Sequence, residues 1–170
     1  HCPPSPVYRE KVSIINRKLA ERYGNHEAVL GWHISNEYSG ECHCDLCKDA
    51  FRAFLRAKYG TIEKLNLAWW TTFWSHDFDD FSQIEPPGPL TETEIHGLNL
   101  DWRRFVTAQT RSFIQNETAP LKEICPHLPT TINMMWDFAE LNYHALSDAF
   151  DVSYETETVR HLSTLTSSIS

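Results

Sequence analysis

The strongest constraint on the fold is an alternation of amphipathic helices with short segments that are apolar almost throughout. Apolar side chains recur at three- and four-residue steps over residues 6–23, and Gly24 supplies a stop, which predicts an amphipathic helix. Residues 28–34 are apolar without alternation, as expected of a strand covered on both faces in a parallel sheet. Further strands are predicted at residues 130–135 and 150–154. This order of elements favours an α/β fold.

The segments between the predicted strands supply the other helices. Asp45 can cap a helix that closes at Gly60, a shorter helix is predicted over residues 61–69, and a long one over residues 101–118. Residues 75–100 have no periodicity, and an irregular segment of this length is usually functional or mobile. No glycine-rich phosphate loop follows a predicted strand, which disfavours a nucleotide-binding sheet. A closed barrel and an open doubly wound sheet both fit the pattern.

Charge and hydropathy exclude two classes of partner. The chain has 15 Lys and Arg against 23 Asp and Glu, a formal charge of −8, so it lacks the basic surplus that sequence-independent nucleic-acid binding requires. The longest nearly apolar stretch, residues 28–34, is far shorter than the roughly 20 residues of a membrane span. The first ten residues show no signal-peptide pattern and begin with His, so we expect the chain to start inside a longer polypeptide.

The cysteines indicate a metal site. The chain has five cysteines, and three of them fall within six residues, too close for a regular set of disulfides: Cys42, Cys44 and Cys47. Such thiolates suit tetrahedral Zn²⁺, and Cys2 is the natural fourth ligand, which would close the site and make the metal structural. His43 or His1 could substitute, or the cysteines could be redox-active, whereas Cys125 resembles a small buried hydrophobe. Metal ligation by thiolates fits a reducing compartment and predicts a cytoplasmic location.

Asn36-Glu37 is the sharpest candidate for catalysis. It directly follows the first predicted strand, and α/β enzymes place catalytic groups at the carboxyl ends of parallel strands. A glycosidase needs a carboxylic acid that protonates the leaving oxygen, and a neighbouring amide can hold a sugar hydroxyl. The alternative is a solvated loop glutamate, since most glutamates are exposed.

An aromatic cluster precedes the long irregular segment. Trp69 has helical spacing from Leu65, which favours packing in the core, whereas Trp74 lies beyond the predicted helix. Aromatic rings stack on the apolar faces of sugars, so Trp74 is a candidate for a sugar subsite, with core packing as the alternative.

Several motifs occur together in an order that resembles one enzyme family. They are GWHISNEY at residues 31–38, the cysteine loop, KYGTIEKLN at 58–66, AW at 68–69 with FWS at 73–75, and CPxSPxYR at 2–9. In this order they resemble glycoside hydrolase family 42, the bacterial β-galactosidases, over residues 2–154. The resemblance implies that residues 1–154 are part of a (β/α)8 TIM barrel, about strands 4 to 6 with their helices, followed by a divergent tail at 155–170.

The resemblance also implies an activity: hydrolysis of terminal non-reducing β-D-galactose with retention of configuration. Glu37 would be the acid/base, Asn36 would bind the sugar, Trp74 would line the galactose subsite, and a structural zinc would be held by Cys2, Cys42, Cys44 and Cys47. Family members commonly form trimers in which a neighbour completes each pocket. The nucleophilic glutamate of the family falls beyond Ser170, so the chain alone should be inactive, because a retaining glycosidase needs both carboxyls.

The chain departs from the family pattern at Trp70, where the family usually has glycine, and the pattern decays after Tyr154. Two other functions fit part of the sequence. One is a different retaining barrel glycosidase with an Asn-Glu pair after its fourth strand. The other is a zinc-stabilised module that binds carbohydrate or protein without catalysis.

Overall fold

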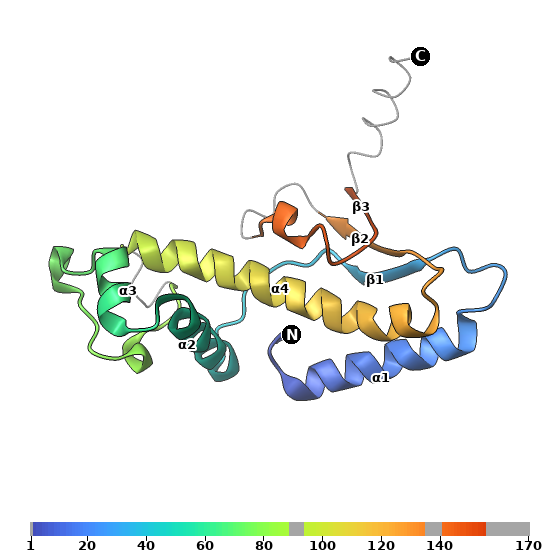
Figure 1. Cartoon of the computed structure of the whole chain (residues 1–170), viewed down its shortest axis with the longest axis horizontal. Helices are drawn as coiled ribbons and strands as arrows, with labels where there is room; N and C mark the ends of the chain where they lie inside the picture. The colour runs from blue at the N-terminus through green and yellow to red at the C-terminus, as the bar shows by residue number, and fades with distance from the viewer. Residues whose placement is uncertain (1, 89–93, 135–140, 156–170) are drawn as a thin grey trace, which may run out of the picture.

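One long helix organises the molecule. The computed structural model describes residues 2–88, 94–134 and 141–155. The helices are α1 (Pro6–Tyr23), α2 (Asp45–Tyr59), α3 (Ile62–Trp69) and α4 (His96–Ile124), with short 3-10 turns η1 (Phe73–Ser75), η2 (Phe81–Gln83) and η3 (Tyr143–Leu146). The strands are β1 (Trp32–Asn36), β2 (Thr130–Met134) and β3 (Val152–Glu155). Helix α4 forms the long axis, with α1 along its C-terminal half and α2 and α3 near its N-terminal half (Figure 1).

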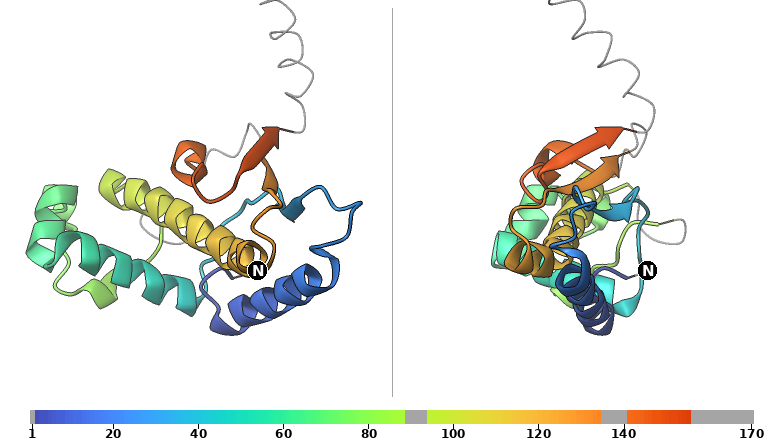
Figure 2. Two further views of the ribbon diagram at one scale, coloured as in Figure 1. Left: turned by 45° about the vertical axis from the view of Figure 1, so that its right-hand side comes forward. Right: turned by 90° about the vertical axis from the view of Figure 1, so that its right-hand side faces the viewer.

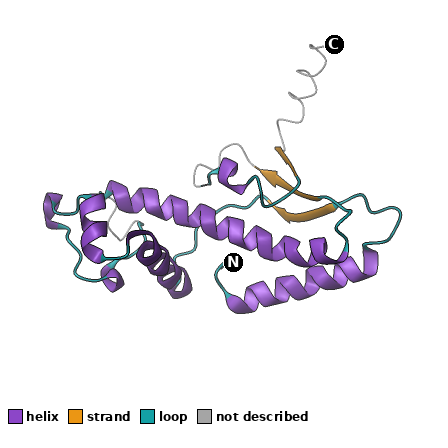
Figure 3. Ribbon diagram, in the orientation of Figure 1, coloured by secondary structure: helices purple, strands orange, loops and turns teal. Residues whose placement is uncertain are grey.

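The three strands form a parallel sheet in the order β1-β2-β3, which confirms the predicted α/β class. The sheet is open within the described residues, and it lies on the opposite side of α4 from α1 (Figures 2 and 3). Asn36 pairs with Asn133, and an irregularity lies between His33 and Asn36. The carboxyl ends of β1 and β2 therefore meet at one edge of the sheet.

The first strand lies later in the chain than its apolar run predicts. Residues 28–31 are outside the strand, because the Val29 amide donates to the His26 carbonyl in a turn. Pairing begins where the Trp32 amide donates to the Pro129 carbonyl, and it continues through Asn36. The prediction that this strand is buried on both faces is also wrong for this chain, since no residue of β1 is fully buried.

Helix α4 stabilises the fold by contributing to three hydrophobic cores, two of them large. Its N-terminal half packs with α2 and α3 around side chains that include Phe51, Leu65 and Trp102. Its C-terminal half places Phe113 against β2 and η3 in the second core. Each such buried side chain contributes about 1.5–3 kcal/mol by leaving water.

Helix α4 is longer at both ends than the predicted 101–118. Its N-cap residue, Ile95, makes no capping hydrogen bond through its side chain, so the sequence carries no start signal there. The helix also continues through Pro120 to Ile124. The irregular segment before it is tied to α3, where the Asn66 amide bonds both the N–H and the carbonyl of Phe78. No helix within the described ranges is long and apolar enough to cross a membrane.

Candidate active site and metal centre

Glu37 lies directly after β1, at the edge of the sheet where the strands end. Its backbone has φ 49°, in the left-handed region that non-glycine residues rarely adopt. The side chain is half-buried, and Asn36, the last residue of the strand, is exposed. The sequence thus predicted correctly that this pair stands at a strand end.

Asn133, near the end of β2, connects these two residues. Its Oδ1 accepts a hydrogen bond from the Glu37 backbone N–H at 3.0 Å. Its Nδ2 lies 3.0 Å from Asn36 Oδ1 and 3.4 Å from Glu37 Oε1. Asn133 is only 3% exposed. Nothing in the hydropathy pattern gave this residue a role, although an amide side chain near the carboxyl end of a predicted strand was a signal.

A buried acid lies behind the site. The Tyr38 hydroxyl donates a hydrogen bond to Glu117 Oε2 of α4, and both side chains are buried. Burial raises the pKa of Glu117 to about 7, although the Tyr38 hydrogen bond opposes the shift. Burial and the nearby Glu117 charge raise the pKa of Tyr38. This contact anchors the residue that follows Glu37 to the core.

The loop after Tyr38 lines a cavity of about 210 Å³ against α4. Glu41 Oε2 accepts from Trp102 Nε1 at 2.8 Å and lies 3.1 Å from His43 Nε2. The His43 and Trp102 rings are 5.0 Å apart between centroids. These contacts fix the path of the chain between Glu37 and the cysteine loop. They also pair the His43 ring with the Glu41 carboxylate.

The four predicted cysteines come together. The Sγ atoms of Cys2, Cys42, Cys44 and Cys47 all lie within 4.8 Å of one another. Cys2 Sγ lies 3.4 Å from Cys44 Sγ and 3.6 Å from Cys47 Sγ. Four thiolates around a tetrahedral ion with bonds of about 2.3 Å would be about 3.8 Å apart, whereas a disulfide needs about 2.05 Å. The donor set therefore fits a tetrahedral metal ion that prefers sulfur.

Local structure explains how the cluster forms. Cys44 is the N-cap residue of α2, a position that the sequence analysis gave wrongly to Asp45, and Cys47 lies in its first turn. Hydrogen bonds from the Cys47 backbone and the neighbouring thiols lower the pKa of Cys44 to about 7, whereas burial raises the pKa of Cys47. The fifth cysteine, Cys125, is buried elsewhere against Trp32 Nε1 at 3.2 Å, as predicted.

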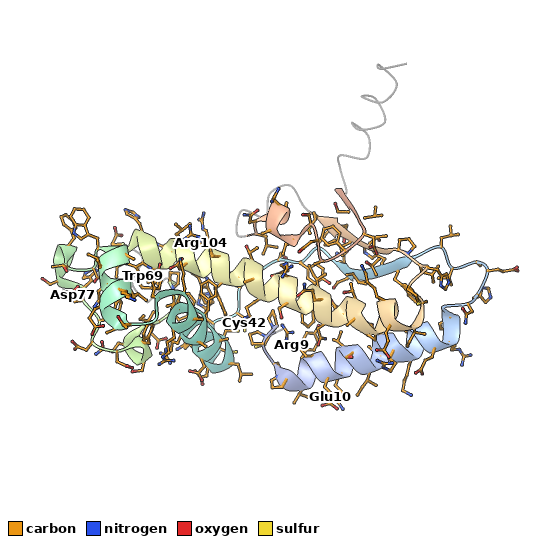
Figure 4. The ribbon with its side chains drawn as sticks, viewed as in Figure 1. Arg9, Glu10, Cys42, Trp69, Asp77 and Arg104 are labelled. Carbon is orange, nitrogen blue, oxygen red and sulfur yellow. The ribbon has the colours of Figure 1, made fainter. Side chains whose placement is uncertain are left out.

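The structure does not bring the segment of Trp74 to Glu37 within one chain. The backbone of Trp74 lies in η1, and its side chain is outside the part that the structure describes. Asp77, two residues beyond η1, lies at the end of the molecule remote from the sheet (Figure 4). Trp69, by contrast, is buried and donates to Asp101 at 3.0 Å, which confirms its place in the core.

Comparison with known proteins gives a consistent result. The sequence profile of a family described as "Beta-galactosidase", number 42 of the glycoside hydrolases, matches residues 1–164. The chain is 60% identical over 152 residues to β-galactosidase BglY of Alicyclobacillus acidocaldarius and 62% identical over 142 residues to β-galactosidase GanA of Bacillus subtilis. These matches cover 89% and 83% of the chain but only 22% and 21% of the relatives, so the chain spans about a fifth of their length.

Solved structures agree. A β-galactosidase from Rahnella sp. R3 superposes with a TM-score of 0.89 at 54% identity, covering 91% of this chain and 23% of that one. Gan42B, a β-galactosidase from G. stearothermophilus, gives 0.88 at 56% identity, covering 91% and 24%.

Proposed function

The chain belongs to glycoside hydrolase family 42, the β-galactosidases, and on this premise we propose that it is the central part of a catalytic barrel. Residues 1–154 would supply about strands 4 to 6 of a (β/α)8 barrel, and residues 155–170 a divergent tail. The parallel order β1-β2-β3 supports this, because β1 and β3 each have an edge that pairs with no strand in the described ranges.

In this proposal the full-length protein hydrolyses terminal β-D-galactosides with retention. The position of Glu37 at the carboxyl end of β1, held by Asn133, is the observation that carries it. Glu37 protonates the glycosidic oxygen while a glutamate outside this chain, about 5–5.5 Å away, attacks the anomeric carbon. Glu37 then takes a proton from water, which displaces that glutamate and releases galactose. Asn36 binds a sugar hydroxyl beside the reacting bond.

We propose that the four cysteines hold a structural zinc ion. Four thiolates complete a tetrahedral shell and leave no position for substrate or water. The ion would then link Cys2 and the start of α2 to the loop that follows Glu37. Metal ligation by thiolates fits a reducing compartment, so the proposed location is the cytoplasm.

We propose that Trp74 lines the galactose subsite of a neighbouring subunit in a trimer. Asp77, three residues after it, lies at the end of the molecule remote from β1, the strand that ends directly before Glu37 (Figures 1 and 4). Beside it, Trp70 and Phe73 are 72% and 55% exposed, with ring centroids 5.7 Å apart. Exposed aromatic side chains of this kind mark interfaces between proteins.

A chromogenic β-galactoside tests the activity. We expect the full-length protein to hydrolyse it, Glu37→Gln to abolish hydrolysis, and the 170-residue chain alone to be inactive. Glu63→Gln, in the exposed first turn of α3, is the control and should keep full activity. Hydrolysis by the isolated chain, or an active Glu37→Gln protein, would overturn the assignment of the two carboxyls. Cleavage of β-glucosides or β-xylosides instead would indicate a different retaining glycosidase.

A further inference from the structure

We propose that Asn133 is a positioning residue that fixes the direction in which Glu37 delivers its proton and the polarity that Asn36 presents to the sugar. The inference rests on the proposed function. Its basis is a single buried amide whose oxygen and nitrogen are both directed at the Asn36-Glu37 pair.

The orientation of the Asn133 amide follows from its partners. The Glu37 backbone N–H is only a donor, so the Asn133 atom 3.0 Å from it must be the acceptor Oδ1. The other end of the amide is therefore the NH₂ group, and it faces two oxygens: Asn36 Oδ1 and Glu37 Oε1. An inverted amide would set donor against donor and oxygen against oxygen.

This orientation constrains the Glu37 carboxyl. Because Asn133 Nδ2 carries only hydrogens, Glu37 Oε1 must meet it with a lone pair whether the carboxyl is protonated or ionised. The transferable proton therefore sits on Oε2. The bond from Oδ1 also offsets part of the energetic cost of the positive φ of Glu37, a conformation that non-glycine residues rarely adopt.

The same amide sets the role of Asn36. Its Oδ1 is occupied by Asn133 Nδ2, whereas its own Nδ2 donates to no group within the described ranges. Asn36 is exposed at the end of β1. Asn36 therefore offers the sugar a donor, which selects a hydroxyl oxygen that accepts.

Assays of the full-length protein with two aryl galactosides distinguish a loss of acid positioning from a nonspecific loss of activity. A phenyl leaving group needs a proton from Glu37, whereas a 2,4-dinitrophenyl group leaves without one. We expect Asn133→Ala to lower kcat/KM for phenyl β-galactoside about 100-fold, the lower range for general acid catalysis. We expect kcat/KM for the dinitrophenyl substrate to fall much less, because its cleavage does not use the acid and only the weaker hold of Asn36 on the sugar affects it.

Asn66→Ala is the matched control, because this amide also bonds two backbone groups but lies far from the sheet, on α3. It should leave the ratio of the two kcat/KM values unchanged. Equal losses on both substrates in Asn133→Ala would overturn the inference. If wild type hydrolyses neither substrate, or Glu37→Gln retains activity on phenyl galactoside, the proposed function itself fails.

Asn133→Asp decides the matter if the alanine variant does not fold. The Asp side chain has the same shape as Asn and keeps an oxygen that accepts from the Glu37 N–H. It replaces the NH₂ group, however, with a second carboxyl oxygen beside the Glu37 carboxyl. Two neighbouring carboxyls share a proton and lose it at higher pH. We expect the alkaline limb of the kcat/KM profile on phenyl galactoside to move up by about one pH unit. An unmoved limb would contradict the role of Asn133.

Discussion

At the scale of a single residue, the buried carboxyl of Glu117 makes the stability of the fold depend on pH. Burial raises its pKa from 4.5 to about 7, so the folded state favours the protonated acid. The stability that this proton contributes is present in full below about pH 4.5 and is lost as the pH rises through about 7. The loss amounts to roughly 3 kcal/mol at most.

We therefore expect Glu117→Gln to remove this dependence. Urea unfolding of the 170-residue chain at pH 5 and pH 8 gives the free energy of unfolding of wild type and of the variant. Relative to the variant, wild type should be more stable at pH 5 than at pH 8. A difference that is the same at both pH values would show that Glu117 does not titrate between them.

Asp101 is the opposite case, because its charge is compensated. It is 1% exposed, and burial would raise its pKa, but hydrogen bonds from Lys58, Tyr59, Trp69 and Arg104 lower the pKa below its ordinary 3.8. Its contribution to stability is thus present above pH 3.8 and is lost as the pH falls through the lower folded value. Asp101→Asn should cost about 2–4 kcal/mol, since it leaves the cations on α2 and α4 without their buried partner.

The exposed pair of Arg111 and Asp148 is the control for Asp101. Both side chains reach water, with exposures of 39% and 64%, so Asp148→Asn should leave the melting temperature close to that of wild type. Thermal unfolding at pH 7 compares the two variants. Equal melting temperatures in the two variants would contradict the importance of burial here.

Site residues could be predicted from the sequence only where their signals are local. The Asn36-Glu37 pair was visible because a strand end can be read from hydropathy. The contacts of Asn133 with this pair were not visible, because they depend on the pairing of Asn36 with Asn133 across nearly a hundred residues. The Glu117–Tyr38 contact also joins residues far apart in the sequence, 79 positions from each other.

At the scale of elements, the cysteine cluster joins the N-terminus to helix α2. We expect the purified chain to bind one zinc ion, and a chelator to lower its melting temperature, because binding energy of this kind is folding energy. Cys2→Ser should bind zinc more weakly, whereas Cys125→Ser, far from the cluster in sequence and buried against Trp32, should keep full occupancy. Metal content by elemental analysis distinguishes these outcomes. Undiminished binding in Cys2→Ser would remove Cys2 from the ligand set.

The elements themselves were predicted where local chemistry marks their ends. Ser5 caps α1 and Pro6 starts it, and Thr61 caps α3, so both helices were predicted within a residue. The start of α4 at His96 has no such cap, and β1 is set by pairing with the chain before β2 rather than by its apolar run. Tertiary contacts decided these boundaries.

At the scale of the whole molecule, the separation of Glu37 from the segment of Trp74 permits a decisive test of assembly. If Trp74 serves a neighbouring pocket, Glu37→Gln subunits and Trp74→Ala subunits of the full-length protein are each deficient for different reasons. Mixed at equal amounts after dissociation, they should regain activity in about a quarter of the sites. A working site needs an intact Glu37 and a neighbour with an intact Trp74, each with a chance of about one half in a closed ring. Sedimentation of the mixture checks that it reassembles. Reassembly without recovery would place Trp74 in the pocket of its own subunit, because mixing then creates no subunit with both side chains.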